Sequence, residues 1–418
     1  MSSLETPPRE RQHDVTPSQE ADSNSPRIAI VGGGIGGLSA AAFLHRAGMN
    51  VTVFEQAPAL GEVGAGLIVS PNSVRLIRRL GHFDEFLSKA VRLKIGWEFR
   101  RWENGKVLFS QKFGDYSQRL YNEDSYSAHR ADLLEAIGSA VPDRLIRLDS
   151  RCVNVIGLNN GARLEFADGS TAEADIVIGA DGIHSVVRRA IFGQESVEYS
   201  GMCAFRAVVP AEKAPAFARR PTQTLWLGPD HHLVHYPMSG GTAINLVAFA
   251  PAGEFTTESW TSTSTTAQLL AEFEGWDPRL TDLISAAQTP GRWALLDRAP
   301  LEKWSYGPIT LLGDAAHPMF PFFAQGSAQA IEDAAALAVC LAEDPGAPEL
   351  ALQKYETLRI GRTTKIQELS HARKDINHLA DGPEQQARDA AFVGVDPLKH
   401  NGWLYSYDAE LAAREAFV

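Results

Sequence analysis

Short runs of apolar, β-branched residues alternate with helical segments along the first part of the chain. Residues 27–31 form such a run, which stops at glycines, and the small apolar residues at 38–46 predict a helix that ends near Gly48. A second β-branched run at 50–54 closes a β-α-β unit of roughly thirty residues. The pattern therefore predicts a parallel, Rossmann-type unit at the start of the ordered chain.

The rest of the chain interrupts this pattern and then resumes it. Apolar periodicity predicts helices at 72–80, 130–140 and about 327–341, and buried strands at 174–179 and 309–312. Residues 163–170 predict a hairpin that turns at Asp168-Gly169. Between about 205 and 249, β-branched and aromatic residues alternate with Pro and Gly, which predicts antiparallel strands. The chain after about Pro348 is polar and helical in pattern.

Composition narrows the class of protein. The 418 residues are 44% hydrophobic and 22% charged, as in an ordinary globular enzyme. The formal net charge of −12 argues against a nucleic-acid partner, because such proteins usually present a net basic face. Cys152, Cys203 and Cys340 are widely separated and form no Cys-x-x-Cys pair. They exclude a disulfide scaffold and a cysteine-based metal site, and they indicate a reducing, cytoplasmic location with no metal.

Neither a membrane span nor a signal peptide is expected. The apolar stretch 28–44 contains five glycines and is too short to cross a bilayer comfortably. Residues 1–26 are polar, hold four prolines and lack a basic start, so we expect a disordered tail there.

The first motif with a chemical meaning lies between the first strand and the first helix. Gly32, Gly34 and Gly37 form Gly-x-Gly-x-x-Gly, which allows a tight turn and lets a pyrophosphate approach bare N–H groups at a helix start. Glu55 ends the second strand, where a carboxylate accepts hydrogen bonds from ribose hydroxyls and repels a 2′-phosphate. We therefore expect the adenosine of NAD or FAD, bound by these four residues.

Two further motifs follow predicted strands. Asp181-Gly182 follows the strand that ends at 179, and Gly313-Asp314 follows the strand 309–312. Gln325-Gly326 then precedes the alanine-rich helix. Each motif alone is compatible with an ordinary turn or a helix cap. Three motifs at strand ends, in this order, point to a flavin site.

With these motifs, the chain resembles the single-component, class A FAD-dependent aromatic monooxygenases over nearly all of 27–408. The runs 323–335 and 403–408 are especially similar to salicylate hydroxylase, 3-hydroxybenzoate 6-hydroxylase and 6-hydroxynicotinate 3-monooxygenase. The resemblance implies that Asp314 binds the ribityl chain of FAD. It also implies that Asp181 lies by the pyrophosphate and, with Arg188, serves the transient contact with NAD(P)H.

The resemblance assigns three more residues to the cofactor. Arg130, at the start of a helix, contacts FAD, and Gly66 belongs to the segment that runs along the isoalloxazine. The helix that begins near Gly326 directs its positive end to the flavin pyrimidine ring.

The resemblance also sets the expected architecture. We expect an α/β fold with a Rossmann-type FAD-binding domain, a mixed β-sheet substrate domain and a helical C-terminal region. After the tail, the FAD-binding domain spans 27–190 and 291–345, the β-rich substrate domain spans 191–290, and the helical region spans 346–418.

The catalytic candidates lie on the strand that contains His231 to Pro237. On a strand, His232, Val234 and Tyr236 share one face, whereas His231 and His235 lie on the other. The resemblance implies that His232 and Tyr236 contact the substrate and help to activate its hydroxyl. A histidine in a sheet is otherwise more often structural.

Substrate identity is less strongly indicated. The 6-hydroxynicotinate 3-monooxygenases have a histidine where this chain has Ile68, and the 3-hydroxybenzoate 6-hydroxylases have a glutamine where it has Pro321. Both differences lead us to expect a more apolar pocket. Arg206 could pair with a substrate carboxylate or be a buried structural arginine.

Together these features predict a monooxygenase that uses FAD, NADH or NADPH, and O2. Its expected substrate is a small phenolic or hydroxypyridine-type aromatic, such as salicylate or a related hydroxybenzoate, attacked through a flavin C4a-hydroperoxide. The alternative is a flavin oxidase or dehydrogenase on the same fold, acting on a small cyclic substrate. No residue selects NADH over NADPH or sets the oligomeric state.

Overall fold

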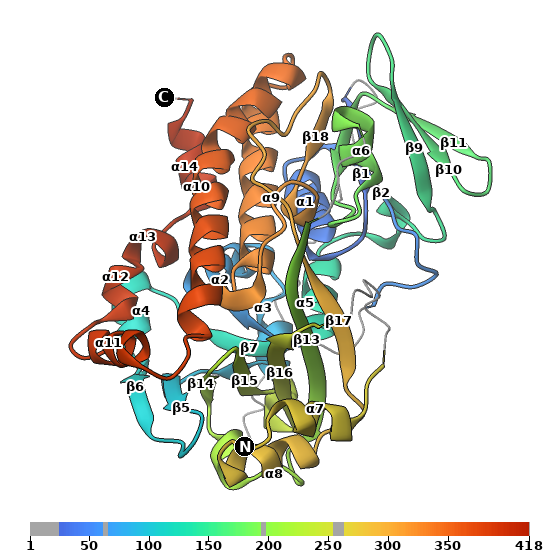
Figure 1. Ribbon diagram of the computed structural model, residues 1–418. Helices are drawn as coiled ribbons and strands as arrows, with labels where there is room; N and C mark the ends of the chain where they lie inside the picture. The colour runs from blue at the N-terminus through green and yellow to red at the C-terminus, as the bar shows by residue number, and fades with distance from the viewer. Residues whose placement is uncertain (1–24, 62–65, 194–197, 254–262, 418) are drawn as a thin grey trace, which may run out of the picture.

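Two large sheets, with helices packed around them, organise the structure (Figure 1). The computed structural model describes residues 25–61, 66–193, 198–253 and 263–417. The expected tail at 1–26 lies outside the described residues except for its last two.

The first sheet is parallel and contains the predicted β-α-β unit. Its strands follow the order Ile309–Leu311 (β18), Ile176–Gly179 (β12), Arg27–Val31 (β1), Asn50–Phe54 (β2) and Ile146–Arg147 (β8). The central strand β1 pairs with β12 on one side and β2 on the other. Its residues from Ile28 to Val31 are all buried, because helices cover both faces of a parallel sheet. The Rossmann-type prediction is confirmed.

Helices from distant parts of the chain pack around this sheet. Those near it are Ile35–Arg46 (α1), Pro71–Arg79 (α2), Phe83–Lys89 (α3), Arg130–Gly138 (α5), Val186–Phe192 (α6), Gly326–Glu343 (α9), Pro348–Asn377 (α10) and Ala409–Glu415 (α14). Helix α9 contacts α1, α2, α10 and α14. Figure 1 shows α9 and α10 side by side, with the helices that follow α10 along their outer side.

The second sheet has seven strands and is mostly antiparallel. Its order is Gly291–Asp297 (β17), Glu198–Pro210 (β13), Ala243–Pro251 (β16), His231–Met238 (β15), Thr222–Gly228 (β14), Gly96–Arg101 (β5) and Val107–Gln111 (β6). Strand β5 pairs with β14 in parallel, so the sheet is mixed. Strands β5, β6 and β17 come from outside 191–290, so the sheet draws strands from three parts of the sequence.

One face of the seven-stranded sheet is covered by Thr266–Glu272 (α7) and Pro278–Ser285 (α8), at the bottom of Figure 1. Alternate strand residues such as Phe205 and Leu246 point to this side and pack with Leu269 and Leu283 of the two helices. Side chains alternate along a strand, so the intervening residues point to the opposite face. That opposite face is available for a site.

Two small sheets and several short helices complete the fold. One sheet is Thr171–Ala174 (β11), Ala162–Phe166 (β10) and Cys152–Gly157 (β9), and it includes the predicted hairpin. The other is Gly66–Val69 (β3), Tyr126–His129 (β7) and Val91–Arg92 (β4). The remaining α-helices are Tyr116–Tyr121 (α4), Pro383–Ala391 (α11), Pro397–His400 (α12) and Gly402–Tyr405 (α13). The 3-10 turns are Asp143–Leu145 (η1), Ala216–Arg219 (η2), Ser239–Gly241 (η3), Gly313–Ala315 (η4) and Pro321–Phe323 (η5).

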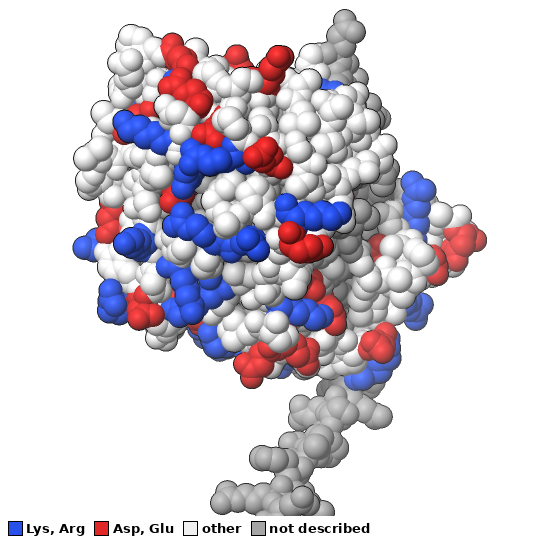
Figure 2. Space-filling view, turned by 90° about the horizontal axis from the view of Figure 1, so that it is seen from below, with Lys and Arg blue, Asp and Glu red and all other residues white. Residues whose placement is uncertain are grey.

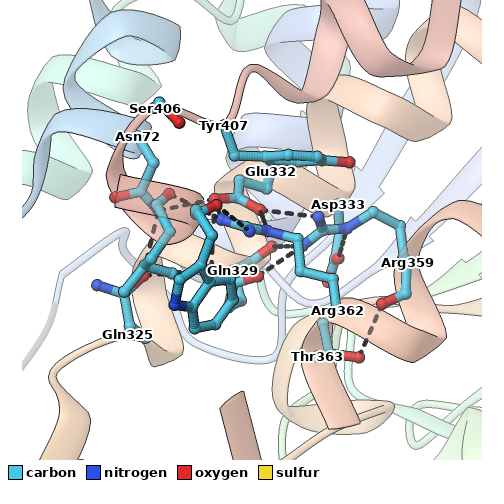
Figure 3. Close-up of polar contacts among 12 residues, drawn as sticks. Asn72, Gln325, Gln329, Glu332, Asp333, Arg359, Arg362, Thr363, Ser406 and Tyr407 are labelled. Carbon is cyan, nitrogen blue, oxygen red and sulfur yellow. Dashed lines mark hydrogen bonds and ion pairs between the residues drawn. The ribbon is translucent and has the colours of Figure 1, made fainter. Parts of the chain in front are cut away.

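Fully buried charges join α9 to α10 (Figure 3). Arg359 of α10 donates to Glu332 Oε2 and to Asp333 Oδ1, both at 2.7 Å. Burial by itself would raise the pKa of the Glu332 carboxyl, but Arg362 and Arg359 outweigh it and the pKa lies below its usual value. The carboxylates therefore remain ionised and hold the two helices together.

The same network reaches the start of α9. Asn72 of α2 donates to Glu332 Oε1 at 2.7 Å and to Gln325 Oε1 at 3.1 Å (Figure 3). Gln325 is the residue immediately before α9. The buried charges thus fix the position at which α9 begins.

Basic and acidic side chains are interspersed on the face of the molecule seen in Figure 2, which therefore carries no broad surface of one sign. Among the described residues, no helix combines the length and the apolar character that a bilayer crossing requires.

We expect Arg359→Met to lower the free energy of unfolding by about 3–5 kcal/mol, because it removes one buried ion-pair partner from each of the carboxylates of Glu332 and Asp333. Urea denaturation near pH 7 measures this loss. Arg163→Met is the matched control, since Arg163 pairs with Glu173 at 2.8 Å while both side chains are about half exposed. The control should lower the free energy of unfolding by less than about 1 kcal/mol. Equal losses in the two variants would contradict the stabilising role of the buried ion pairs of Arg359.

Candidate functional site

A cavity of about 640 Å³ lies between the parallel sheet and the free face of the seven-stranded sheet. Ten of the eleven predicted site residues line it. They are Gly32, Gly34, Glu55, Gly66, Arg130, Asp181, His232, Tyr236, Asp314 and Gly326.

Gly37 is the exception, because it does not line the cavity, and its contact with a cofactor stays a prediction. A Cβ at this position would lie 1.9 Å from the carbonyl oxygen of Gly32, so only glycine lets α1 approach the preceding strand. Gly37 therefore serves helix packing, behind the cavity wall.

The start of α1 forms one end of the cavity. Gly32 has a φ of +106°, and a Cβ there would lie 2.4 Å from the carbonyl oxygen of Ala180. Gly34 caps the helix without a side chain, and nothing lies within 4 Å of where its Cβ would be. The first turn contains no acidic residue, so its N–H groups suit an anion such as a pyrophosphate.

Two carboxylates border this end, and both also bond to the backbone. Glu55 accepts from the N–H groups of Gly33 at 2.6 Å and Ala57 at 2.8 Å. Asp181 accepts from Val186 N–H at 2.7 Å and from Ser185 Oγ at 2.5 Å, so it caps α6. Carboxylate oxygens have lone pairs beyond these bonds, and their contacts with a cofactor stay a prediction.

Arg130 and Asp314 lie near each other along the cavity. Burial lowers the pKa of Arg130, and the charge of Asp314 opposes that effect. Arg188, in contrast, is buried outside the cavity wall and donates to the carbonyl oxygens of Ala315 at 3.2 Å and Ala316 at 3.3 Å. It fastens α6 to the segment that carries Asp314, and the contact of Arg188 with NAD(P)H stays a prediction.

The start of α9 forms the middle of the cavity. Gln325 precedes the helix without capping it, and the first turn holds no acidic side chain. Gly326 and Ser327 line the cavity, so the N–H groups of this turn face it. Negative charge in the cavity would be stabilised here.

The far half of the cavity is floored by the seven-stranded sheet. Val234 pairs with Val247 of β16, which pairs with Arg206 of β13. Residues paired across strands share a face, and these three side chains line the cavity. Residues two positions along the same strands line it as well, namely His232, Tyr236 and Phe249. His232 and Tyr236 lie there, as the alternation predicts. His235 lies on the other face, where burial and Arg100 lower its pKa to about 3.

His232 is buried in an aromatic setting. Its ring stacks on Phe249 at 4.4 Å and meets the edge of Phe322 at 5.1 Å between centroids. Its Nδ1 lies 2.6 Å from Nε2 of His378, the residue after α10. Burial, His378 and His231 hold the pKa of His232 well below its usual value, so the ring is neutral near pH 7.

Tyr236 stays protonated, and its ring packs beside Gly66 of β3. Burial raises its pKa above the usual value, which Arg206 only partly offsets. A Cβ on Gly66 would lie 2.6 Å from Asn245 and 2.8 Å from the Tyr236 ring. Gly66 donates to Asn245 Oδ1 at 2.9 Å, which joins β3 to the floor of the cavity.

Arg206 is a positively charged side chain on the part of the cavity floored by the seven-stranded sheet. Its guanidinium lies 4.8 Å from the centre of the Trp293 ring, and burial lowers its pKa to about 10. The described residues place no carboxylate in an ion pair with Arg206, and its buried Nε has no hydrogen-bond partner among them. An anionic group in the cavity would supply that partner.

Several residues of this wall were not predicted from the sequence. Phe249 and Trp293 could have been found by following the alternation on β16 and β17, because both lie on the same face as His232. Nothing near His378 in the sequence marks it, since its contact with His232 joins residues 146 positions apart.

The residues present fit FAD. The cavity is continuous from the bare backbone at Gly34, past Arg130 and the start of α9, to the aromatic floor at Phe249. An elongated molecule with a central pyrophosphate and a flat ring system suits this sequence of surroundings. Among the described residues, no group of His, Cys, Asp and Glu is arranged to hold a metal ion.

Comparisons with known proteins agree with the assignment of the cavity to FAD. The model of the FAD binding domain family matches residues 26–370. The chain is 38% identical to 3-amino-4-hydroxybenzoate 2-monooxygenase from Streptomyces platensis, over 93% of this chain and 97% of that protein. It is 39% identical to 6-hydroxynicotinate 3-monooxygenase from Pseudomonas fluorescens, over 84% and 91% of the two chains. A solved salicylate hydroxylase substrate complex superposes with a TM-score of 0.79 at 26% identity, over 94% and 98%.

We expect Asp314→Ala to weaken FAD retention by about tenfold or more, since a charged acceptor at a sugar hydroxyl is worth about 1.5–3 kcal/mol. The flavin-to-protein absorbance ratio after gel filtration measures retention. Asp344→Ala, at the other end of α9 and outside the cavity, is the control. A fully loaded Asp314→Ala protein would remove Asp314 from the cofactor site.

Proposed function

Since the chain belongs to the FAD binding domain family and, within it, to the class A FAD-dependent aromatic monooxygenases, we propose that its substrate is an aromatic ring that carries both a hydroxyl and a carboxylate. The chain is an oxidoreductase that uses FAD, NAD(P)H and O2 to hydroxylate a small aromatic compound. Bound FAD supplies electron transfer from NAD(P)H and the activation of O2.

The observation that carries the proposal is the placement of Arg206 and His232 on one face of the sheet. Arg206 lies on β13 and His232 on β15, with β16 between them. Two strand spacings separate them by on the order of 10 Å, which leaves room for a single ring between the two side chains. One end of that ring meets a cation, and the other meets a neutral imidazole.

His232 is suited to take the hydroxyl proton. Its pKa lies well below its usual value, so it is unprotonated near pH 7, and its ring lines the cavity. Sharing the proton of a phenol makes the ring more electron-rich, which hydroxylation requires. Tyr236 keeps its own proton and can donate a hydrogen bond to the same oxygen.

Arg206 is suited to bind the carboxylate. A buried guanidinium with a free donor direction gains a charge-assisted hydrogen bond when a carboxylate enters. The names of the relatives support this assignment, because 3-amino-4-hydroxybenzoate, 6-hydroxynicotinate and salicylate each carry a carboxylate and a ring hydroxyl or its tautomer.

Apolar walls separate these two polar groups. Val234, Val247 and Phe249 come from the sheet, and Phe322 comes from η5. They keep water from the ring, which strengthens the charge interaction at Arg206 and limits loss of activated oxygen to solvent. The alternative of a flavin oxidase has no named relative to support it among those described above.

We expect acids to be preferred over matched compounds that lack the carboxylate. The pairs are 3-amino-4-hydroxybenzoate with 2-aminophenol, salicylate with phenol, and 6-hydroxynicotinate with 2-hydroxypyridine. Oxidation of NADH and of NADPH is followed together with product and peroxide. At least one acid should yield hydroxylated product with kcat/KM about tenfold or more above its partner. In Arg206→Gln that acid should lose about 10- to 100-fold and its partner less than threefold. Equal losses for both would contradict the role of Arg206.

We expect His232→Ala to keep its flavin and to lose about 10²–10⁴-fold in kcat for hydroxylation, the typical effect of a general base. Flavin absorbance reports loading, and chromatography reports product. His235→Ala, on the opposite face of the same strand, controls for damage to the sheet. An unchanged kcat in His232→Ala would exclude this residue as the base.

A further inference from the structure

A second histidine, His378, contacts His232 on the side away from the cavity. The reaction described so far assigns it no role. Nε2 of His378 lies 2.6 Å from Nδ1 of His232, and the ring centroids are 4.7 Å apart. His378 follows the last turn of α10 and also meets the edge of Phe322 at 5.9 Å. His378 is absent from the cavity wall and is partly exposed, so it lies between His232 and solvent.

The surroundings of His378 favour one tautomer for each of the two rings. The backbone of Lys374 hydrogen-bonds the His378 ring and raises its pKa, as a carbonyl acceptor does. Because Nε2 of His378 faces His232, we assign the proton of a neutral His378 to Nδ1, the nitrogen left to donate to this carbonyl. A neutral His378 then has a lone pair on Nε2 and accepts from Nδ1–H of His232. This leaves the lone pair of His232 on Nε2, for which the described residues provide no hydrogen-bond partner.

We propose that His378 is a positioning residue for His232, which fixes the imidazole with its basic nitrogen toward the substrate and carries the substrate proton onward to solvent. This inference rests on the proposed function, in which His232 takes the proton of a substrate hydroxyl.

The proton balance requires no other reactant. The hydroxyl O–H breaks as its proton forms a bond to Nε2 of His232. The Nδ1 proton of His232 moves to Nε2 of His378, which makes that ring a cation with both nitrogens protonated. The cation then releases one proton to water at its exposed edge, and a neutral pair is restored once the tautomers relax.

The charges around the pair favour release of the proton over storage. His231 of β15 and Lys374 of α10 are the charged or titratable groups that act on it, and both are basic. Phe249 and Phe322 pack against it without charge. Burial, with these groups, lowers the pKa of His378 to about 4, so both rings are neutral above about pH 5.

Two substitutions of similar size at His378 test whether the residue acts as a hydrogen-bond acceptor or only fills space. Gln places an amide oxygen at about the reach of His Nε2, whereas Met has nearly the same length and only a weak acceptor. The flavin-loaded proteins His378→Gln and His378→Met are compared with wild type by flavin absorbance and thermal unfolding, and then with the probe 4-hydroxy-3-nitrobenzoate. Its nitro group makes ionisation of the bound hydroxyl visible by difference spectroscopy.

In wild type, we expect the bound probe to ionise at a lower pH than the free probe. In His378→Met its apparent pKa should rise by about one unit, a tenfold loss of phenolate, whereas His378→Gln should keep the wild-type value within about 0.3 units. With the best acid of the panel, kcat should fall about 10- to 100-fold in His378→Met, while KM stays within about threefold. In a His232→Ala background, His378→Met should cause no further loss.

Equal behaviour of the Gln and Met variants would overturn the role of His378, because a residue that only fills space would not distinguish them. A further loss in the His232→Ala background would also overturn it. If wild type binds the probe without promoting its ionisation, both this inference and the proposed role of His232 fail. A wild type that ionises the probe while the variants match it would overturn only the inference about His378.

Discussion

The buried ion pairs between α9 and α10 are the constraint on which both halves of the site depend. Arg359 binds Glu332 and Asp333 with all three side chains fully buried, so sliding one helix against the other would separate charges away from water. Helix α9 begins at the cofactor half of the cavity. Helix α10 continues for 18 residues beyond Arg359, about 27 Å, and the next residue, His378, contacts His232 in the other half of the cavity. One cluster of charges therefore sets the relation between the two halves.

The seven-stranded sheet separates structure from chemistry by the alternation of its side chains. One face packs on α7 and α8 through apolar residues such as Phe205 and Leu246. The other face forms the cavity floor, where His232, Tyr236 and Arg206 stand among aromatic and aliphatic residues. A one-residue shift in register would exchange the two sets, so the packed face also guarantees the position of the reactive one.

Burial gives the polar groups of the cavity different charges at the same pH. It lowers the pKa of His232 and keeps that ring neutral, it raises the pKa of Tyr236 and keeps that hydroxyl protonated, and it leaves Arg206 charged with a pKa of about 10. A neutral imidazole, a protonated hydroxyl and a buried cation result from one apolar environment. Such a combination suits a phenolic acid bound next to a flavin.

The sequence by itself determined the features that local rules control. Glycine spacing and strand ends predicted the Rossmann-type unit, and period-two alternation predicted the shared face of His232 and Tyr236. The resemblance to the monooxygenases, rather than a local rule, implied most of the ten residues that line the cavity. Only the tertiary structure decided what depends on contacts between distant segments. It assigned Gly37 to packing and Arg188 to fastening α6, and it brought His378 against His232 across 146 positions. The physical reason is that local geometry follows from neighbouring residues, whereas hydrogen-bond partners and pKa values depend on which remote groups exclude water from a side chain.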